Sequence, residues 1–194
     1  IILRNNVAVN VDSQVFLGEA DASNLIMVNN LMENSLGPFA INIDPVLHDN
    51  VIFAFNTLWN SSQCQIYREG MPEPNGLVMR YNLFGARHAA GDLEGPGLDF
   101  DYNLYDLHNE HLFSMAEHSI ETNPENTNPT TTDLFVDLTS TWVEALERVD
   151  YSGDFHLSAG SPARDMGLDD MGIGYDLEWT PRDESPDVGC YEGR

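Results

Sequence analysis

An asparagine recurs five times in the first half of the chain, each time flanked by short runs of alternating apolar residues. Successive copies lie 24, 26, 26 and 21 residues apart. A fixed period in the low twenties, with alternating instead of helical hydrophobicity, is typical of a solenoid of stacked β-coils. We therefore predict an all-β parallel solenoid with about five coils over residues 1–106. The repeated residues are Asn6, Asn30, Asn56, Asn82 and Asn103.

Asparagine suits such a repeat for two physical reasons. It tolerates a backbone φ above zero, which the sharp turns between short strands often require, better than other non-glycine residues. Its side-chain amide can also bond to the amides of the coils on either side, forming a ladder along the solenoid axis. We expect the five asparagines to have this structural role and not to bind a ligand.

Charge restricts the partners of this chain. Its 194 residues contain 32 acidic side chains and 8 basic ones, all of them arginine, and the net charge is −24. Residues 92–194 hold 24 of the acids and 4 of the arginines, which gives −20 for that half. Such a surface repels nucleic acid and anionic membranes, so we expect neither nucleic-acid binding nor membrane insertion. Carboxylates can bind hard cations such as Ca²⁺, so one interpretation of this charge is a calcium site. The alternative is an acidic surface that only favours solubility.

The chain opens directly inside a coil at Ile1. Proteins normally cover a raw sheet edge. We expect the first coil to stack on a partner, which is either a preceding N-terminal part of a longer chain or another subunit.

The period ends near residue 106, and a different organisation is expected beyond it. Residues 107–153 indicate an irregular insert with a possible short helix, either within 108–120 or at Trp142–Val149, which has a plausible N-cap and early acids. Residues 154–194 form a closing segment of the same domain. Cys64 and Cys190 match no metal motif. Cys190 is interpreted as a buried free thiol, and a disulfide between the two stays open.

The closing segment carries the second strong signal. It contains DFHLSAGSPARDMG at 154–167 and YDLEWTPRDESPDVGCYE at 175–192. With the asparagine repeat, these blocks resemble the C-terminal part of right-handed parallel β-helix proteins of the pectate-lyase-like superfamily. Such proteins commonly close with SPAxDxG, DxxGxxR and D[IV]G[AC][YF]E blocks, and Trp179 stands here where the middle block usually has glycine. The resemblance implies a right-handed parallel β-helix with a loop-rich closing segment.

The same blocks contain three aspartates around a lone arginine. A bidentate pair between Arg182 and one of these carboxylates is expected to tie the last coil to its cover. This role is structural, and the aspartates are Asp165, Asp176 and Asp187.

The resemblance further implies a secreted or cell-surface protein that binds or cleaves a polysaccharide, as a lyase or a glycoside hydrolase. Lyases need a base and carboxylates that hold Ca²⁺, and hydrolases need two acids across the sugar bond. Asp99 and Asp101 flank Phe100, so in a strand both point to one face. They are candidates for calcium binding or catalysis, and the alternative is a capping or turn role. The candidates for a basic site are Arg68, Arg80 and His88, and the alternative is that they are solvated charges on loops.

Two further patterns and one alternative function complete the predictions. His108 and His111 have the spacing of a shared helical face and are a candidate metal pair. The aromatic residues of the coils are expected mainly in the core, with a few outward ones available as a sugar platform. The alternative function is a non-catalytic surface, adhesion or filament-forming module, which a measurement of size would separate from a free enzyme.

Overall fold

The computed structural model contains only β-strands, turns and loops among the residues it describes. These are residues 1–11, 16–18, 23–34, 41–43, 49–61, 64–65, 75–86, 89–90, 98–105, 111–112, 117–121, 134–143 and 148–193. Most of the strands are short and pair in parallel across separations of 21 to 26 residues. The prediction of an all-β chain with stacked parallel strands is confirmed, and the arrangement is compatible with a β-solenoid.

Three parallel sheets account for the repeat. Sheet A contains β1 (Ile2–Arg4), β4 (Ser23–Val28), β7 (Asp49–Ala54), β10 (Asn75–Arg80) and β13 (Leu98–Asp101). Sheet B contains β2 (Val7–Val9), β5 (Leu31–Glu33), β8 (Thr57–Ser61), β11 (Leu83–Ala86), β14 (Leu104–Tyr105) and β16 (Ile120–Glu121). Sheet C contains β3 (Phe16–Gly18), β6 (Ile41–Ile43), β9 (Cys64–Gln65), β12 (Ala89–Ala90) and β15 (His111–Leu112).

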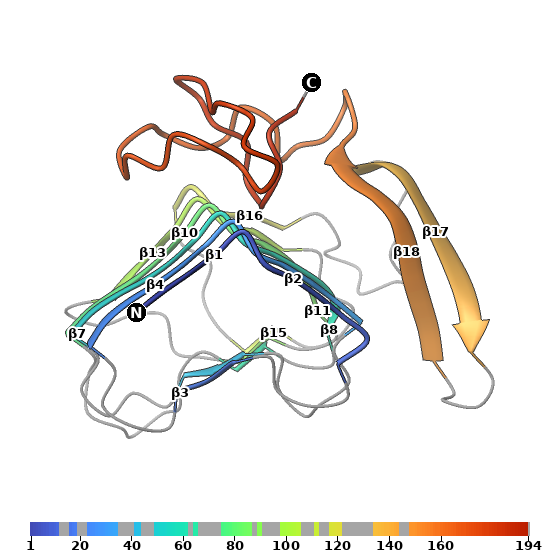
Figure 1. Cartoon of the computed structure of the whole chain (residues 1–194), viewed down its shortest axis with the longest axis horizontal. Helices are drawn as coiled ribbons and strands as arrows, with labels where there is room; N and C mark the ends of the chain where they lie inside the picture. Colours follow the sequence, from blue (N-terminus) through green and yellow to red (C-terminus); the bar gives the residue numbers. More distant parts are fainter. Residues whose placement is uncertain are drawn as a thin grey trace.

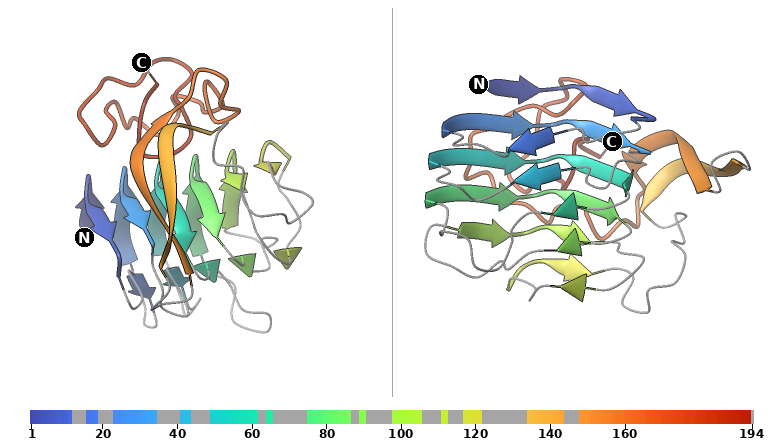
Figure 2. Two further views of the ribbon diagram at one scale, coloured as in Figure 1. Left: turned by 90° about the vertical axis from the view of Figure 1, so that its right-hand side faces the viewer. Right: turned by 90° about the horizontal axis from the view of Figure 1, so that it is seen from below.

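One strand from each sheet makes one coil, and successive coils stack in register (Figures 1 and 2). Seen down the stack, sheets A and B meet at a corner and sheet C lies opposite it (Figure 1). Strands β15 and β16 continue sheets C and B, so the stacked part extends to Glu121 and not only to residue 106. Within 108–120 the described residues, 111–112 and 117–120, lie in strands, a turn or a loop and not in a helix.

Side chains alternate between the two faces of sheets A and B. On the inner face of sheet A, Met27, Phe53 and Met79 lie in register and are buried. On the inner face of sheet B, Phe84 stacks on Tyr105 with ring centroids 5.3 Å apart. The interior of the coils is therefore a stack of equivalent apolar residues, one layer per coil.

The repeated asparagines form a continuous amide ladder inside the corner between sheets A and B. The backbone N–H and Nδ2 of Asn6, Asn30, Asn56 and Asn82 each donate to the Oδ1 of the next ladder asparagine, at 2.8–3.1 Å. Each Nδ2 from the second coil onward also donates to a carbonyl of the preceding coil, as Asn56 does to Met27 at 3.0 Å. Repetition of these bonds satisfies every buried amide of the ladder.

At the corner between sheets A and B, the positive φ angle occurs one position before the ladder asparagine. The residue before each ladder asparagine has φ between 53° and 60°, whereas the ladder asparagines themselves are absent from the left-handed region. We call these five residues the corner residues. They are Asn5, Asn29, Phe55, Tyr81 and Tyr102.

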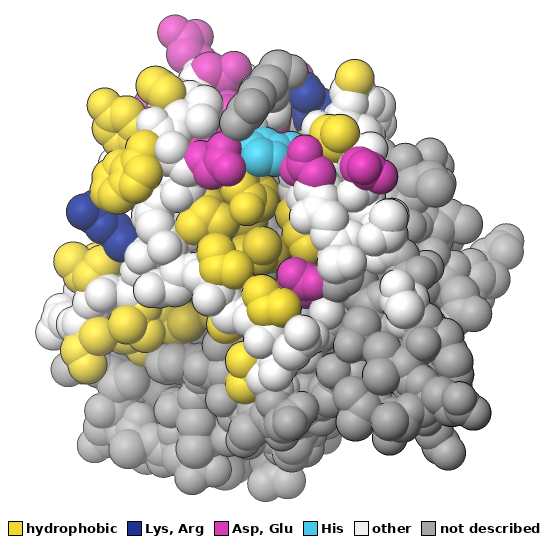
Figure 3. Space-filling view, turned by 45° about the vertical axis from the view of Figure 1, so that its right-hand side comes forward, with side chains coloured by type: hydrophobic (Ala, Val, Ile, Leu, Met, Phe, Trp, Pro, Cys, Tyr) yellow, Lys and Arg dark blue, Asp and Glu magenta, His cyan; other side chains and the backbone are white. Residues whose placement is uncertain are grey.

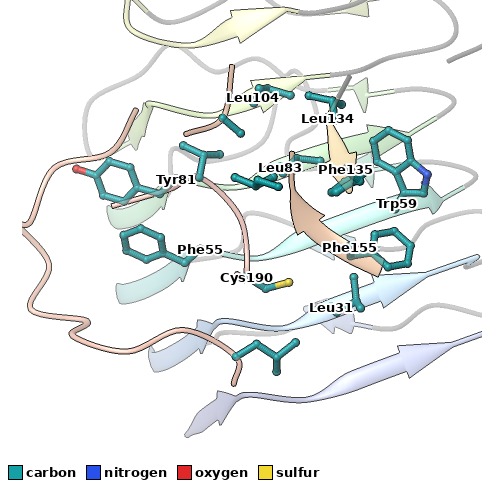
Figure 4. Packing of buried hydrophobic residues seen from close by; sticks show 14 of the residues in the cluster. Leu31, Phe55, Trp59, Tyr81, Leu83, Leu104, Leu134, Phe135, Phe155 and Cys190 are labelled. Carbon is teal, nitrogen blue, oxygen red and sulfur yellow. The ribbon is translucent and has the colours of Figure 1, made fainter. Parts of the chain in front are cut away.

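A β-hairpin replaces the helix expected at Trp142–Val149. Strand β17 (Phe135–Val143) pairs antiparallel with β18 (Arg148–Leu157), and Trp142 lies opposite Val149. That helix prediction is wrong at both of its ends, because pairing between the strands overrides local helix propensity. The hairpin lies beside sheet B, where Phe135 meets the Trp59 ring edge-on with centroids 4.8 Å apart (Figures 1 and 4).

A second apolar core lies outside the coils. The closing segment covers the corner between sheets A and B (Figure 1), and its buried side chains meet those that the coils direct outward (Figure 4). The cluster joins coils, hairpin and closing segment, and includes Phe55, Trp59, Tyr81, Leu83, Leu104, Phe135, Phe155, Leu177, Val188 and Cys190. These aromatic residues of the coils are buried, as expected, but Phe55, Trp59 and Tyr81 pack outside the solenoid interior.

Candidate functional site

The corner residues attach the closing segment to the coils. In the first two coils the corner residue is itself an asparagine, so the sequence contains an Asn-Asn pair. The Nδ2 of Asn5 donates to the carbonyls of Asp176 and Leu177 at 2.7 and 2.8 Å, and that of Asn29 to the carbonyl of Tyr175 at 2.6 Å. The first asparagine of each pair therefore faces outward and holds the closing segment, while the second belongs to the ladder.

Arg182 is the main buried charge of this attachment, and its side chain is 2% exposed. Its Nη1 donates to Glu192 Oε2 at 2.9 Å, its Nη2 donates to Asn29 Oδ1 at 3.0 Å, and the guanidinium lies 4.1 Å from the Phe55 ring centroid. Arg182 therefore ties the closing segment to two coils. Its carboxylate partner is Glu192 through a single nitrogen, and not a bidentate aspartate, which corrects the expected pairing.

Two of the three aspartates of the closing motif accept backbone N–H bonds instead. Asp176 accepts three backbone N–H bonds at 2.7–2.9 Å, and Asp187 accepts two, one of them from Asp165 at 2.7 Å. Asp165 itself adopts a left-handed φ of 55°. Burial raises the pKa of Asp187, and these hydrogen bonds oppose that rise. The motif thus organises the cover and engages the carboxylates of Asp176 and Asp187 in backbone hydrogen bonds.

Two of the predicted site residues meet on the outer face of sheet A. Arg80 Nε lies 2.7 Å from Asp99 Oδ1, and Arg80 Nη1 lies 2.6 Å from Asp170 of the closing segment. The hydroxyl of Tyr81 donates to the other oxygen of Asp170 at 2.7 Å. Burial and this bond raise the pKa of Tyr81. The arrangement is a partly exposed ion-pair network that fastens a loop of the closing segment to the fourth and fifth coils.

Asp101 has a different partner, His118, with Oδ2 and Nδ1 2.7 Å apart. Burial alone would raise the pKa of Asp101, but the bonds from His118 and from two backbone N–H groups lower it overall. The bond to Asp101 raises the pKa of His118, whose ring stacks on Tyr102 at 4.6 Å. Asp99 and Asp101 are therefore engaged separately. No trio of His, Cys, Asp or Glu side chains in the described part of the chain is arranged around a metal position, and the calcium expectation stays a prediction.

Several predicted residues lie where the structure gives no site geometry. Arg68, His88 and His108 fall outside the described residues. Cys64 and His111 lie in β9 and β15, and only their strand pairing is described. Cys190 is a buried free thiol, and burial raises its pKa to about 12.

An exposed aromatic pair lies on the outer surface of the closing segment. The Tyr175 and Trp179 side chains are 53% and 58% exposed, with ring centroids 6.4 Å apart and planes inclined by 51°. The guanidinium of Arg4, from the first coil, lies 5.2 Å from the Trp179 ring centroid. We call Tyr175 and Trp179 the aromatic platform. It is the candidate functional site.

The backbone at Trp179 is in an unfavourable conformation for this residue. Its φ is 66°, in the left-handed region that costs a side chain with a Cβ roughly 1–2 kcal/mol. Asp176 fixes the turn, because its carbonyl accepts the Trp179 N–H at 3.2 Å and its carboxylate accepts the Thr180 N–H at 2.7 Å. This turn position favours glycine, and the chain nevertheless places a large exposed ring there.

A histidine lies between a carboxylate of the hairpin and one of the closing segment. His156 Nδ1 lies 2.5 Å from Asp154 Oδ1, and Nε2 lies 3.3 Å from Oε2 of Glu178, the neighbour of Trp179 in the chain. The imidazole packs against Tyr191, with centroids 4.3 Å apart. Figure 3 shows a histidine flanked by acidic side chains, with apolar side chains next to them. His156 thus links the hairpin to the closing segment.

Sequence reasoning did not identify this platform as a site. Its one signal was Trp179 in place of the usual glycine of the closing motif. Comparison with protein-family models, curated proteins and solved structures finds no match for this chain. Within the described residues, no helix has the length and apolar character needed to span a membrane.

Proposed function

We propose that this protein is an extracellular right-handed parallel β-helix of the pectate-lyase-like superfamily, and that it binds a polysaccharide through the aromatic platform. The stacked parallel sheets and the use of the closing motif as a cover support the family. The single observation that carries the function is the exposed Tyr175–Trp179 pair, with Trp179 held at a left-handed φ.

Stacking on sugars gives this arrangement a physical purpose. One face of a pyranose ring presents C–H groups, which pack favourably on the negative face of an aromatic ring. Exposed apolar side chains that lie next to each other are typical of ligand-binding surfaces. Backbone strain that persists in a fold often serves a function, and replacement of Trp179 by glycine would relieve it.

The geometry favours binding over cleavage. Hydrolysis needs two carboxylates across the scissile bond, and elimination needs an available base. Among the residues proposed for such roles, Arg80 is committed to Asp99 and Asp170, and Asp101 to His118. Cleavage by a lyase or hydrolase mechanism stays a prediction for the residues outside the described ranges.

The test is affinity gel electrophoresis in gels that contain one polysaccharide each. We expect one polymer to retard the wild-type protein, and Trp179→Ala to lower the affinity by about tenfold or more. The control is Val136→Ala, because Val136 is 58% exposed on the hairpin, like Trp179, but lies outside the platform. Retardation that survives Trp179→Ala, or no retardation by any polymer, contradicts the proposal. Assays for reducing ends and unsaturated uronates on the same polymers test cleavage.

A second candidate function, a stacking module, rests on a separate observation at the first coil. Ile1 and Val7 are 80% and 57% exposed there. The ladder also gives this coil a specific surface, because in later coils the equivalent of Asn6 Oδ1 accepts two hydrogen bonds. We propose that the first coil receives another β-coil, from a longer chain or from a second subunit. Light scattering over a range of concentrations tests the second case, which a monomer throughout would contradict.

A further inference from the structure

We infer that the aromatic platform selects a single, twisted, uncharged glycan chain and rejects both crystalline polysaccharide surfaces and acidic polymers. This inference rests on the proposed glycan-binding function and narrows it to a class of ligand. Three properties of the platform carry it: the angle between the rings, the rigidity of their attachment and the charges around them.

The angle between the rings excludes a flat ligand. The Tyr175 and Trp179 planes are inclined by 51°, and their centroids are 6.4 Å apart. Sugar rings at a crystalline surface present coplanar faces, so a surface that stacks on one of these rings meets the other obliquely. A chain that rotates between successive sugars can place one ring face on each aromatic side chain. The platform therefore matches a helical or twisted chain in solution.

The fold ties down the backbone that carries both rings. The carbonyl of Tyr175 accepts the Asn29 Nδ2 bond at 2.6 Å, and Tyr175 forms an antiparallel bridge with Pro181. Trp179 lies in the turn fixed by Asp176, with Arg4 against its ring. Side chains on a backbone tied to the coils lose less entropy on binding than side chains on a free loop. The two rings therefore project from fixed backbone positions in the free protein.

The surrounding charges favour a ligand without charge. Glu178 is the chain neighbour of Trp179, and residues 92–194, which include both platform residues, carry 24 acids against 4 arginines. This field repels polyuronates. Arg4 lies against the Trp179 ring itself and repels the ammonium groups of a polyamine chain at that position. Hydroxyl groups, in contrast, can donate to carboxylates and accept from the guanidinium.

The test compares four probes: soluble arabinoxylan, microcrystalline cellulose, polygalacturonate and chitosan. We expect binding to arabinoxylan alone, lost with Trp179→Ala and little changed by added salt, since an uncharged ligand has no charge to screen. Binding to cellulose crystals that Trp179→Ala abolishes would leave the proposed function intact and overturn the twist. Trp179-dependent binding to polygalacturonate or chitosan would overturn the charge argument. Binding to none of the four would overturn this inference, whereas the wider polymer panel decides the proposed function.

A chain-length series isolates the contribution of the second ring. Wild-type protein should bind xylotetraose about tenfold or more tighter than the monosaccharide xylose, because a single sugar covers only one ring and two successive sugars are needed to cover both. Tyr175→Ala should remove this advantage, and Tyr175→Phe should keep it, since stacking does not need the hydroxyl. Both variants alter an exposed side chain, and unchanged thermal midpoints verify that they fold. An equal length advantage in wild type and Tyr175→Ala would show that the two rings do not act on one chain.

Discussion

The interior of the coils and the closing segment both bury polar groups, but they satisfy them in different ways. In the coils one set of amide bonds repeats, with the same donors and acceptor in each coil. In the closing segment no pattern of hydrogen bonds repeats, and the single side chain of Arg182 donates to Glu192, Asn29 and two backbone carbonyls. A periodic structure lets a single residue type solve the problem many times, whereas an irregular cover needs a specific partner for each group.

The two regions meet at neighbouring residues. Asn6 belongs to the ladder, and Asn5 bonds to the closing segment. In later coils the outward position is aromatic, and Phe55 packs on Tyr81 with centroids 4.7 Å apart. The same left-handed backbone position thus carries an amide that bonds to the closing segment in the first coils and an aromatic ring in the later coils.

The largest expected effect is in the middle of the ladder. Asn56→Ala leaves the backbone and side-chain donors of Asn30 and the carbonyl of Met27 buried without these partners, and each such group costs about 1–3 kcal/mol. We expect a loss of about 3–5 kcal/mol in urea unfolding. Asn6→Ala, at the exposed end of the ladder, is the control and should cost about 1 kcal/mol. Equal losses for the two variants would contradict a ladder whose strength depends on burial.

The next effect tests whether the cover and the coils unfold separately. Arg182→Ala leaves Glu192 buried without its cation, which we expect to cost about 3–5 kcal/mol. Hydrogen exchange should increase over residues 161–193 while the ladder amides stay protected. An unchanged thermal midpoint would show that Arg182 does not tie the closing segment to the coils. Equal loss of protection in the closing segment and in the coils would show that the two unfold as one cooperative unit, which contradicts separate unfolding. Arg4→Ala, which removes an exposed arginine, serves as the control.

A smaller effect has the opposite sign. Trp179→Gly removes a Cβ from a left-handed backbone position at φ 66°, and we expect stability to rise by about 0.5–1 kcal/mol. Trp179→Ala keeps the strained backbone and should give no such gain. Thermal unfolding of both variants measures the difference. Loss of stability in Trp179→Gly beyond that in Trp179→Ala would mean that the turn is not strained.

The smallest effect depends on pH and concerns the fifth coil. The raised pKa of His118 gives a stabilisation that is present below its ordinary value of 6.5 and is lost as pH rises through the higher folded value. The lowered pKa of Asp101 gives a stabilisation that is present above its ordinary value of 3.8 and is lost as pH falls through the lower folded value. Wild type should therefore exceed His118→Gln in thermal midpoint at about pH 5, and the difference should shrink at about pH 9. A difference that is larger at the higher pH would contradict this pair.

The sequence predicted the repeated features better than the unique ones. Five asparagines at a regular spacing indicated stacked parallel strands, and the strands pair at those spacings. The prediction of a helix at Trp142–Val149 was wrong, because Trp142 and Val149 are paired in the antiparallel strands of a hairpin. The sequence indicated that Arg182 ties the closing segment to the coils, but not that its partner is Glu192. The carboxylates of Asp176 and Asp187, which lie closer to Arg182 in the chain, accept backbone N–H bonds instead.

The period, the alternation of apolar residues and the closing motif determine the architecture, because each acts through local spacing that stacking then repeats. Tertiary structure decided which member of each Asn-Asn pair faces inward, which carboxylate meets Arg182, and how far Tyr175 and Trp179 are tilted. These depend on how an irregular cover settles on the outer corner of the coils. No spacing along the chain encodes that contact, because its partners are as many as 172 residues apart.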